Sequence, residues 1–216
     1  MARRFEAPLG SVLPLSFYER PVLDVARDCV GMTLTHKTPE GIASGRIVES
    51  EAYRGPEDLA AHSAGGLRTK RTEAMFGRAG RAYMFLLYGM HWAFNIVAGL
   101  EGEPHAVLVR AIEPVDGGLL MAKRRGVEAS RRELSNGPGK VSAAFGLTGA
   151  AYGMDLCHRA DPEAPEAESE LYLTWGPSVP VGRSPRINVD YAGAWAARPW
   201  RFYERGNRYV SVPPRE

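Results

Sequence analysis

Three residues with acidic or aromatic side chains alternate along one predicted strand. Glu49, Glu51 and Tyr53 lie at the end of the segment 42–53, and a period of two places them on one face. A carboxylate can serve as a general base when it reaches water and a nearby cation keeps it ionised. Arg110, in the otherwise apolar segment HAVLVRAI, is a candidate partner, because a buried arginine usually needs a carboxylate. The alternative is that these residues form the solvent-facing side of a half-buried strand.

One histidine follows this strand closely. His62 ends the segment PEDLAAH, in which Pro56 is expected to open a short helix through about Ala61. His62 either faces Tyr53 across a pocket or is a structural or exposed histidine. No second histidine or cysteine has metal-ligand spacing to it, and the chain's two cysteines form no CxxC pattern. The sequence therefore predicts no metal site and no disulfide framework.

Two apolar arms of the segment RAYMFLLYGMHWAFNIV predict a β-hairpin over residues 81–97. Phe85 lies on the first arm, and Asn95, on the second, is polar in an apolar run, so its amide needs a partner. Tyr88 precedes Gly89 at the reversal, where a polar turn is the usual choice. An aromatic residue at a rigid tip flanked by basic segments is typical of a side chain that inserts between stacked bases. Most of the hairpin also fits a core strand pair, with Asn95 capping a turn.

A glycine-rich segment, SNGPGK, leads into a predicted helix that ends near Phe145. Gly139 and Lys140 at this helix start are able to hold a phosphate group. The spacing is not that of the GxxxxGK[ST] loop, so nucleoside triphosphate binding is not predicted. A backbone phosphate of a nucleic acid remains a candidate ligand.

The elements that must position these residues are mostly strands. Helices are expected near residues 16–19, 21–31, 115–125 and 140–145, and strands near 32–37, 42–53, the two hairpin arms, 105–112, 171–174, 186–190 and 208–212. Strands joined by short turns, with helices interspersed, predict an α+β fold. We expect a single domain over residues 16–216, with a curved, mainly antiparallel sheet, surrounding helices and a protruding β-hairpin. Residues 1–15 are expected to be a flexible lead-in.

Composition sets broad limits on the class of protein. The chain has 216 residues, 44% of them hydrophobic and 24% charged, with a formal net charge of +2, as in ordinary globular proteins. Segments 66–83 and 121–140 are basic and segment 154–171 is acidic, which fits either two charged faces or a solvated surface. The acidic residues 158–170 are expected to form a surface loop. No apolar run approaches the roughly 20 residues of a membrane span.

Five segments, in order between about residues 16 and 212, resemble the alkyladenine (3-methyladenine) DNA glycosylase family of the mammalian type. They are GRIVESEAYRGPEDLAAHS, YMFLLYGMHWAFNIV, VLVRAIEP, SNGPGK and RPWRFYERG with YVSV. The resemblance implies a monofunctional enzyme of base excision repair. Such an enzyme flips alkylated, etheno or deaminated purines from duplex DNA. It hydrolyses the N-glycosidic bond with an activated water and leaves an abasic site.

The resemblance also implies a role for each candidate residue. Glu51 would be the general base, and Arg110 would hold the water or the carboxylate. Tyr53 would stack on one face of the flipped base, with His62 and Phe85 on the other. The family often has tyrosine where this chain has Phe85, so the stacking surface is kept and a hydroxyl contact is lost.

Other candidates concern specificity and DNA contact. Asn95 would crowd the exocyclic amino group of guanine and bias the pocket against that base. Tyr88 would fill the gap left by the extruded nucleotide. Lys140 and Gly139 would contact the DNA backbone.

No metal and no cofactor is expected, and the expected partner is double-stranded DNA that contains damaged purines. The chain is expected to be a monomer without membrane contact, cytoplasmic and associated with the nucleoid in a bacterium, or nuclear in a eukaryote. Two alternatives stay open: a non-catalytic protein that binds lesion-containing DNA, and a hydrolase of free nucleosides. An excision assay on duplex DNA separates all three.

Overall fold

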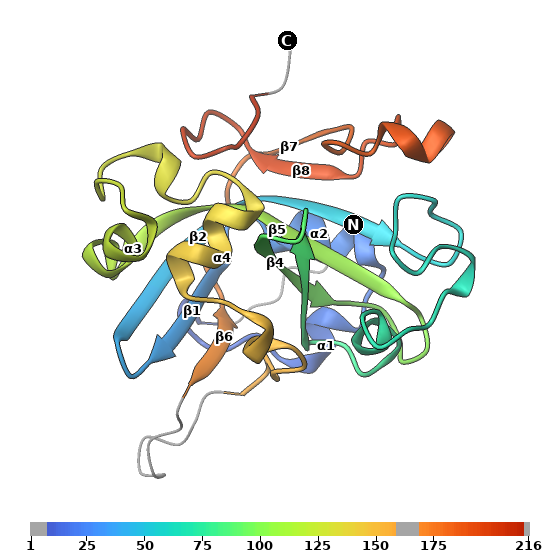
Figure 1. Ribbon diagram of the computed structural model, residues 1–216, viewed down its shortest axis with the longest axis horizontal. Coiled ribbons are helices and arrows are strands. Elements are labelled where there is room, and N and C mark those ends of the chain that lie inside the picture. Colours follow the sequence, from blue (N-terminus) through green and yellow to red (C-terminus); the bar gives the residue numbers. More distant parts are fainter. Residues whose placement is uncertain (1–7, 159–168, 214–216) are drawn as a thin grey trace.

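The computed structural model describes residues 8–158 and 169–213. These residues form a single domain around one eight-stranded sheet, with the strand order β3-β4-β5-β2-β1-β6 (Figure 1). The strands are β1 (Thr33–Thr38), β2 (Gly41–Arg54), β3 (Ala82–Leu87), β4 (His91–Val97), β5 (His105–Asp116), β6 (Glu170–Thr174), β7 (Val181–Ser184) and β8 (Arg201–Glu204). Every strand pair in this sheet is antiparallel. The expected α+β domain with a mainly antiparallel sheet is confirmed.

The long strand β2 changes its neighbour halfway along one edge. Its first half pairs with β1 through the turn at Gly41, and its second half, at residues 49–51, pairs with β8. β7 in turn pairs with β8. Figure 1 shows β7 and β8 together beside β2, towards the C-terminal end of the chain. The last part of the sequence is therefore brought against the acidic half of β2.

Within the described ranges, four α-helices surround the sheet: α1 (Leu15–Tyr18), α2 (Val22–Cys29), α3 (Gly118–Arg125) and α4 (Pro138–Phe145). In α2 the buried residues are Val22, Val25, Ala26 and Cys29, which lie on one face by helical spacing. Helix α4 begins with a proline at its first turn and ends at Gly146 in the left-handed conformation. Short 3₁₀ segments occur at Ala64–Gly66, Glu73–Phe76, Arg132–Leu134, Gly149–Ala151 and Asp190–Trp195, the last with a kink at Gly193.

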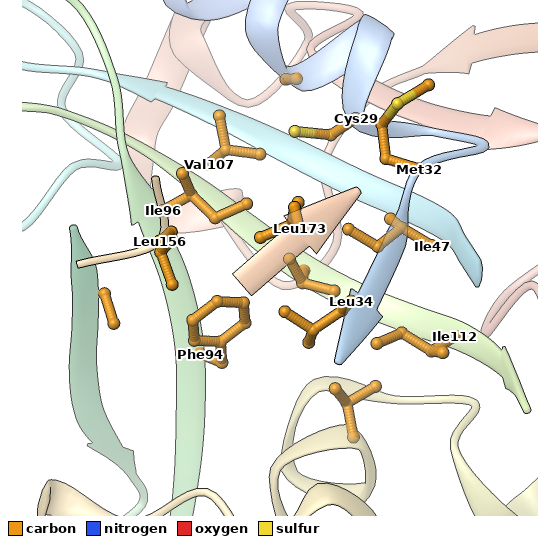
Figure 2. Packing of buried hydrophobic residues seen from close by; sticks show 14 of the residues in the cluster. Cys29, Met32, Leu34, Ile47, Phe94, Ile96, Val107, Ile112, Leu156 and Leu173 are labelled. Atoms are coloured by element: carbon orange, nitrogen blue, oxygen red, sulfur yellow. The ribbon is translucent and has the colours of Figure 1, made fainter. Parts of the chain in front are cut away.

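One hydrophobic core fills the space between these helices and one face of the sheet. Leu34, Ile47, Phe94, Val107 and Leu173 meet there, as Figure 2 shows. Strands that cross this core alternate between two sides, because successive side chains of a strand point to opposite faces. On β5, Val107 and Val109 belong to the core, whereas Ala106, Leu108 and Arg110 line a cavity. The core thus fixes the strands whose other face forms the site.

Three expected elements are wrong, and each error has a local cause. Residues 56–61 form turns and no helix, because the Asp58 carboxylate accepts hydrogen bonds from the backbone N–H groups of Arg54 and Ala60. Such side-chain bonds compete with helical ones. Residues 186–190 and 208–212 are not strands. Backbone groups within them bind buried side chains of the site, as described below, and so are not free for a β-ladder.

The start of the described chain is packed. The backbone N–H of Leu13 donates to the carbonyl of Leu173, Val12 bridges to Thr174, and the Leu13 side chain has no exposed surface. Packing against β6 therefore begins before residue 16. The expected acidic loop at 158–170 lies mostly outside the described residues. Among residues 8–158 and 169–213, no helix is both long and apolar enough to cross a membrane.

Candidate active site

A cavity of about 480 Å³ lies on the face of β5 that points away from the core. Its walls come from the β3–β4 hairpin, β5, the segment after β2, the start of α4 and residues 187–191. All of the predicted site residues except Glu51 line it: Tyr53, His62, Phe85, Tyr88, Asn95, Arg110, Gly139 and Lys140. The structure therefore brings the candidates of the sequence together around one space.

Glu51 lies directly behind this wall and has no exposed surface. Its Oε2 accepts a hydrogen bond from the Tyr53 hydroxyl at 2.8 Å, and its Oε1 accepts one from the backbone N–H of Ile187 at 2.8 Å. Nη1 of Arg110 is 3.4 Å from the same Oε1. All three neighbours line the cavity. Two hydrogen-bond donors and one guanidinium group thus compensate a carboxylate that has no contact with solvent.

Glu49 is buried as well, which excludes the alternative that this face of β2 points to solvent. β8 and the residues that follow it cover this part of the strand. Burial, followed by the charge of Glu51, raises the pKa of Tyr53 well above its usual value. The phenol therefore stays protonated near neutral pH and donates to the carboxylate.

Two irregularities in the β2–β5 ladder place Arg110. Ile47 pairs with Ile112 and Glu49 pairs with Ala111, so Val48 is an extra residue on β2. Ser50 then pairs with Val109, which makes Arg110 the extra residue on β5. Bulges of this kind re-aim a side chain. The register of the two strands thus turns an arginine within an apolar strand towards the two glutamates.

The aromatic wall is built from the hairpin and the segment after β2. The rings of His62 and Phe85 meet edge to face, with their centroids 4.4 Å apart. His62 Nδ1 is 2.8 Å from the hydroxyl of Tyr83. Burial, together with the charge of Arg71, lowers the pKa of His62 to about 4. His62 is therefore a neutral ring at physiological pH and presents a flat, uncharged edge or face to the cavity.

A buried ion pair supports Tyr53 from behind. Arg186 binds the Asp58 carboxylate through both outer nitrogens, at 2.5 and 2.9 Å, and donates to the carbonyl of Ala52 at 2.9 Å. Its guanidinium carbon lies 4.8 Å from the centroid of the Tyr53 ring. Both partners of this pair have fully buried side chains. Sequence reasoning identified neither residue, although Arg186 directly precedes Ile187, whose N–H binds Glu51.

The hairpin tip is exposed, unlike the rest of the site. Tyr88 and Gly89 both have positive φ, at 51° and 70°, and the N–H of Met90 donates to the carbonyl of Leu87 at 3.0 Å. This is the geometry of a type I′ turn, in which asparagine and glycine are preferred. A tyrosine in the left-handed region costs about 1–2 kcal/mol. The side chain of Tyr88 is nevertheless 79% exposed, so packing does not explain its presence.

Asn95 and the start of α4 complete the walls. The amide nitrogen of Asn95 donates to the carbonyls of Tyr83 at 3.1 Å and Ala93 at 3.4 Å, which fixes the orientation of the amide. Lys140 Nζ donates to Oδ1 of Asn136 at 2.8 Å. A Cβ at Gly139 would lie 2.9 Å from the Cβ of His91, so glycine permits the close approach of α4 to the hairpin.

The described residues contain no group of three or more histidine, cysteine, aspartate or glutamate side chains arranged to hold a metal ion. The polar groups behind the cavity instead form carboxylate–arginine pairs.

Comparison with known proteins defines the class. Residues 16–208 match the family model described as methylpurine-DNA glycosylase (MPG), so the protein is a DNA glycosylase, a hydrolase of N-glycosyl bonds. More particularly, the chain belongs to the methylpurine-DNA glycosylase family. The resemblance read from the sequence motifs is thereby confirmed.

Two curated relatives agree with this assignment. A protein of Methanocella arvoryzae (strain DSM 22066 / NBRC 105507 / MRE50) is 45% identical over 201 residues, which cover 93% of this chain and 96% of the relative. A protein of Bacillus subtilis (strain 168) is 45% identical over 201 residues, covering 92% and 96%. Each carries the name "Putative 3-methyladenine DNA glycosylase". The similarity therefore extends over nearly the whole length of both chains.

Proposed function

We propose that this chain removes damaged purines from double-stranded DNA by flipping the nucleotide into the cavity and hydrolysing its glycosidic bond with a water activated by Glu51. The observation that carries the proposal is that Arg110 and Tyr53, which line a cavity with aromatic walls, converge on Glu51 directly behind it. The same cavity is bordered by the exposed ring of Tyr88.

Flipping has an energetic cost that the cavity can offset. Extruding a base costs a few kcal/mol, least where the pair is damaged or mismatched. Stacking on aromatic side chains returns about 1–3 kcal/mol for each base. Tyr53, His62 and Phe85 supply such surfaces, and a positively charged alkylpurine gains a further cation–π term of about 0.5–2 kcal/mol. Alkylated purines are therefore favoured substrates, and Tyr88 fills the space left in the duplex.

Hydrolysis needs a base for water and a stabiliser for positive charge. Cleavage of an N-glycosidic bond passes through an oxocarbenium-like sugar, as in glycoside hydrolysis. The negative charge of Glu51 stabilises this cation, and the carboxylate accepts the proton of the attacking water. Arg110 pairs with Glu51 and orients its carboxylate. Asn95, with its amide fixed on the cavity wall, crowds the exocyclic amino group of guanine and disfavours that base.

Strand cleavage is not part of the proposed reaction. A glycosylase with lyase activity needs an amine nucleophile, and Lys140 is the lysine that lines the described cavity. Its Nζ donates a hydrogen bond to Oδ1 of Asn136, and we do not assign it as a nucleophile. We assign Lys140 and Gly139 to the DNA backbone, and we expect the protein to act as a monomer on duplex DNA without a metal or cofactor.

A base-release assay tests the proposal. Duplexes that carry ethenoadenine, hypoxanthine or 3-methyladenine are incubated with excess protein, and free base is measured. The unaltered chain should release base and leave an uncut abasic strand. Glu51→Gln should bind the same duplexes but release base at least about 100-fold more slowly, since a general base contributes about 10²–10⁴-fold.

Three outcomes would contradict parts of this proposal. A near-normal rate for Glu51→Gln would remove Glu51 from its role. Binding of lesion duplexes without any release by the unaltered chain would indicate a protein that only shields lesions. Release from free nucleosides that duplex DNA does not inhibit would indicate a nucleoside hydrolase.

A further inference from the structure

A second carboxylate lies buried two residues before Glu51, and it accepts more hydrogen bonds than Glu51 does. Glu49 Oε1 accepts from Nε of Arg110 at 3.0 Å, from Nε of Arg201 at 2.7 Å and from the hydroxyl of Ser211 at 2.9 Å. Its Oε2 accepts from the backbone N–H of Ser211 at 2.6 Å. A carboxylate has about four acceptor positions. Glu49 is therefore nearly saturated by protein donors and cannot itself bind water as a base.

We propose that Glu49 is a positioning residue of the glycosylase reaction: it fixes the guanidinium of Arg110 in the orientation that serves Glu51. This inference rests on the proposed function. Because Nε of Arg110 is bound to Glu49, the planar guanidinium has little freedom to rotate. Its outer nitrogen Nη1 is then held 3.4 Å from Oε1 of Glu51. The same group borders the cavity, so Glu49 acts on the substrate only through Arg110.

Charge balance supports the same division of roles. Glu49 and Glu51 lie beside two guanidinium groups, those of Arg110 and Arg201, and all four residues are buried. Buried ions need partners, and removal of one leaves the others uncompensated. Without the charge of Glu49, Arg110 would move towards Glu51 and occupy the oxygen that should accept the proton of water. Glu49 thus limits how closely Arg110 binds the carboxylate of Glu51.

The residues that hold Glu49 come from the far end of the chain. We call residues 209–212 the C-terminal segment. Within it, the backbone and side chain of Ser211 bind Glu49, and the carbonyl of Val212 accepts a hydrogen bond from Arg201. Tyr209 packs at the bulge of β2. The C-terminal segment therefore completes the network with residues that do not line the cavity.

Comparing Glu49→Gln with the unaltered chain tests this inference. The variant keeps the shape of the side chain but loses its charge. At a temperature where both proteins are folded, its affinity for lesion duplex should change less than about threefold. Its single-turnover rate should fall about 10- to 100-fold. Metal sites lose activity by this factor when a hydrogen-bond partner of a metal-ligating side chain is removed. A residue with a merely structural role would not separate rate from affinity in this way.

The matched control is Glu113→Gln. Glu113 also pairs with an arginine, Arg46, and with Asn207, but it does not line the cavity. Its replacement should leave rate and affinity unchanged. Ser211→Ala, which removes one donor to Glu49 and no charge, should lower the rate severalfold and provides the test if Glu49→Gln does not fold.

A folded Glu49→Gln, or failing that a folded Ser211→Ala, that excises at the normal rate would overturn the inference. An equal loss of affinity and rate would also overturn it, because Glu49 would then support the whole pocket. Absence of base release by the unaltered chain would refute the proposed function, and this inference with it. Activity of the unaltered chain and the behaviour of the variants therefore separate the two failures.

Discussion

The two ends of the cavity are built in opposite ways. At the inner end, Glu51, Arg110, Asp58 and Arg186 are buried, charged and paired with one another or with backbone groups. At the outer end, Tyr88 and Met90 are 79% and 72% exposed. The inner end is fixed by its own structure, and the outer end is left free to contact something else.

Under the proposed function, this difference in burial corresponds to two separate roles, catalysis at the inner end and DNA contact at the outer end. A reacting carboxylate works best when its environment is fixed before the substrate arrives, because no reorganisation is then needed during the reaction. An inserting side chain must instead be accessible and must prefer stacked bases to water. Under the proposed function, changes at the inner end should therefore alter stability and chemistry, whereas changes at the outer end should weaken DNA binding without loss of stability.

The largest effect is expected at the inner end, for Asp58→Ala. It leaves Arg186 as a buried charge without its carboxylate, which costs about 3–5 kcal/mol of unfolding free energy. Chemical denaturation measures the loss. As a control, Asp24→Ala removes an exposed ion pair with Arg27 and should cost no more than about 1 kcal/mol. Equal losses for the two variants would show that the buried pair does not support the site.

The outer end is tested by Tyr88→Asn. Asparagine suits the left-handed conformation at this position, so unfolding free energy should stay the same or rise by about 1 kcal/mol. Affinity for lesion duplex should fall about 10- to 100-fold, the loss of about 1–3 kcal/mol of stacking. Fluorescence of 2-aminopurine beside the lesion reports flipping. An unchanged signal, or a destabilised protein, would contradict the proposed contrast between the two ends.

A smaller effect is expected for Lys140→Ala. Lys140 lines the cavity wall between the two ends. Binding of duplex DNA should weaken steeply with salt, because phosphate contacts release counterions. Removing one phosphate contact should reduce the slope of log affinity against log salt by about one. Titrations at several salt concentrations measure it. A slope equal to that of the unaltered chain would place Lys140 away from the DNA backbone.

The smallest effect concerns pH and His62. Because burial lowers its pKa from 6.5 to about 4, the unfolded chain takes up this proton at a higher pH than the folded protein does. The contribution of the neutral His62 ring to the unfolding free energy is therefore complete above pH 6.5, and it is lost as the pH falls towards 4. His62→Asn, which can keep the bond to Tyr83, should lose less stability than the unaltered chain over this range. Melting temperatures of the variant and the unaltered chain, measured at several pH values, compare the two losses. Parallel curves of melting temperature against pH would contradict the lowered pKa of His62.

Local patterns in the sequence were enough to predict residues that the structure gathers around one cavity, while their roles stay predictions. Alternation placed Glu51 beside Tyr53, and the apolar arms around Tyr88-Gly89 predicted the hairpin and its exposed tip. Each of these signals lies within a few neighbouring residues. The motifs from residue 16 onwards also identified the family that the comparison established.

The rest depends on contacts between distant residues, which leave no local pattern. Asp58 and Arg186 are 128 positions apart, and nothing near either residue indicates the other. The expected strands at 186–190 and 208–212 failed because the N–H groups of Ile187 and Ser211 bind carboxylates. Apolar alternation cannot distinguish a backbone group that joins a ladder from one that binds a buried side chain.

The span of the network around Glu49 has a consequence for local unfolding. Ser211 binds a residue 162 positions earlier in the chain, so detachment of residues 209–212 alone would remove these bonds while the hairpin and the aromatic walls stay in place. Local fraying of this segment therefore removes the support of Glu49 without global unfolding.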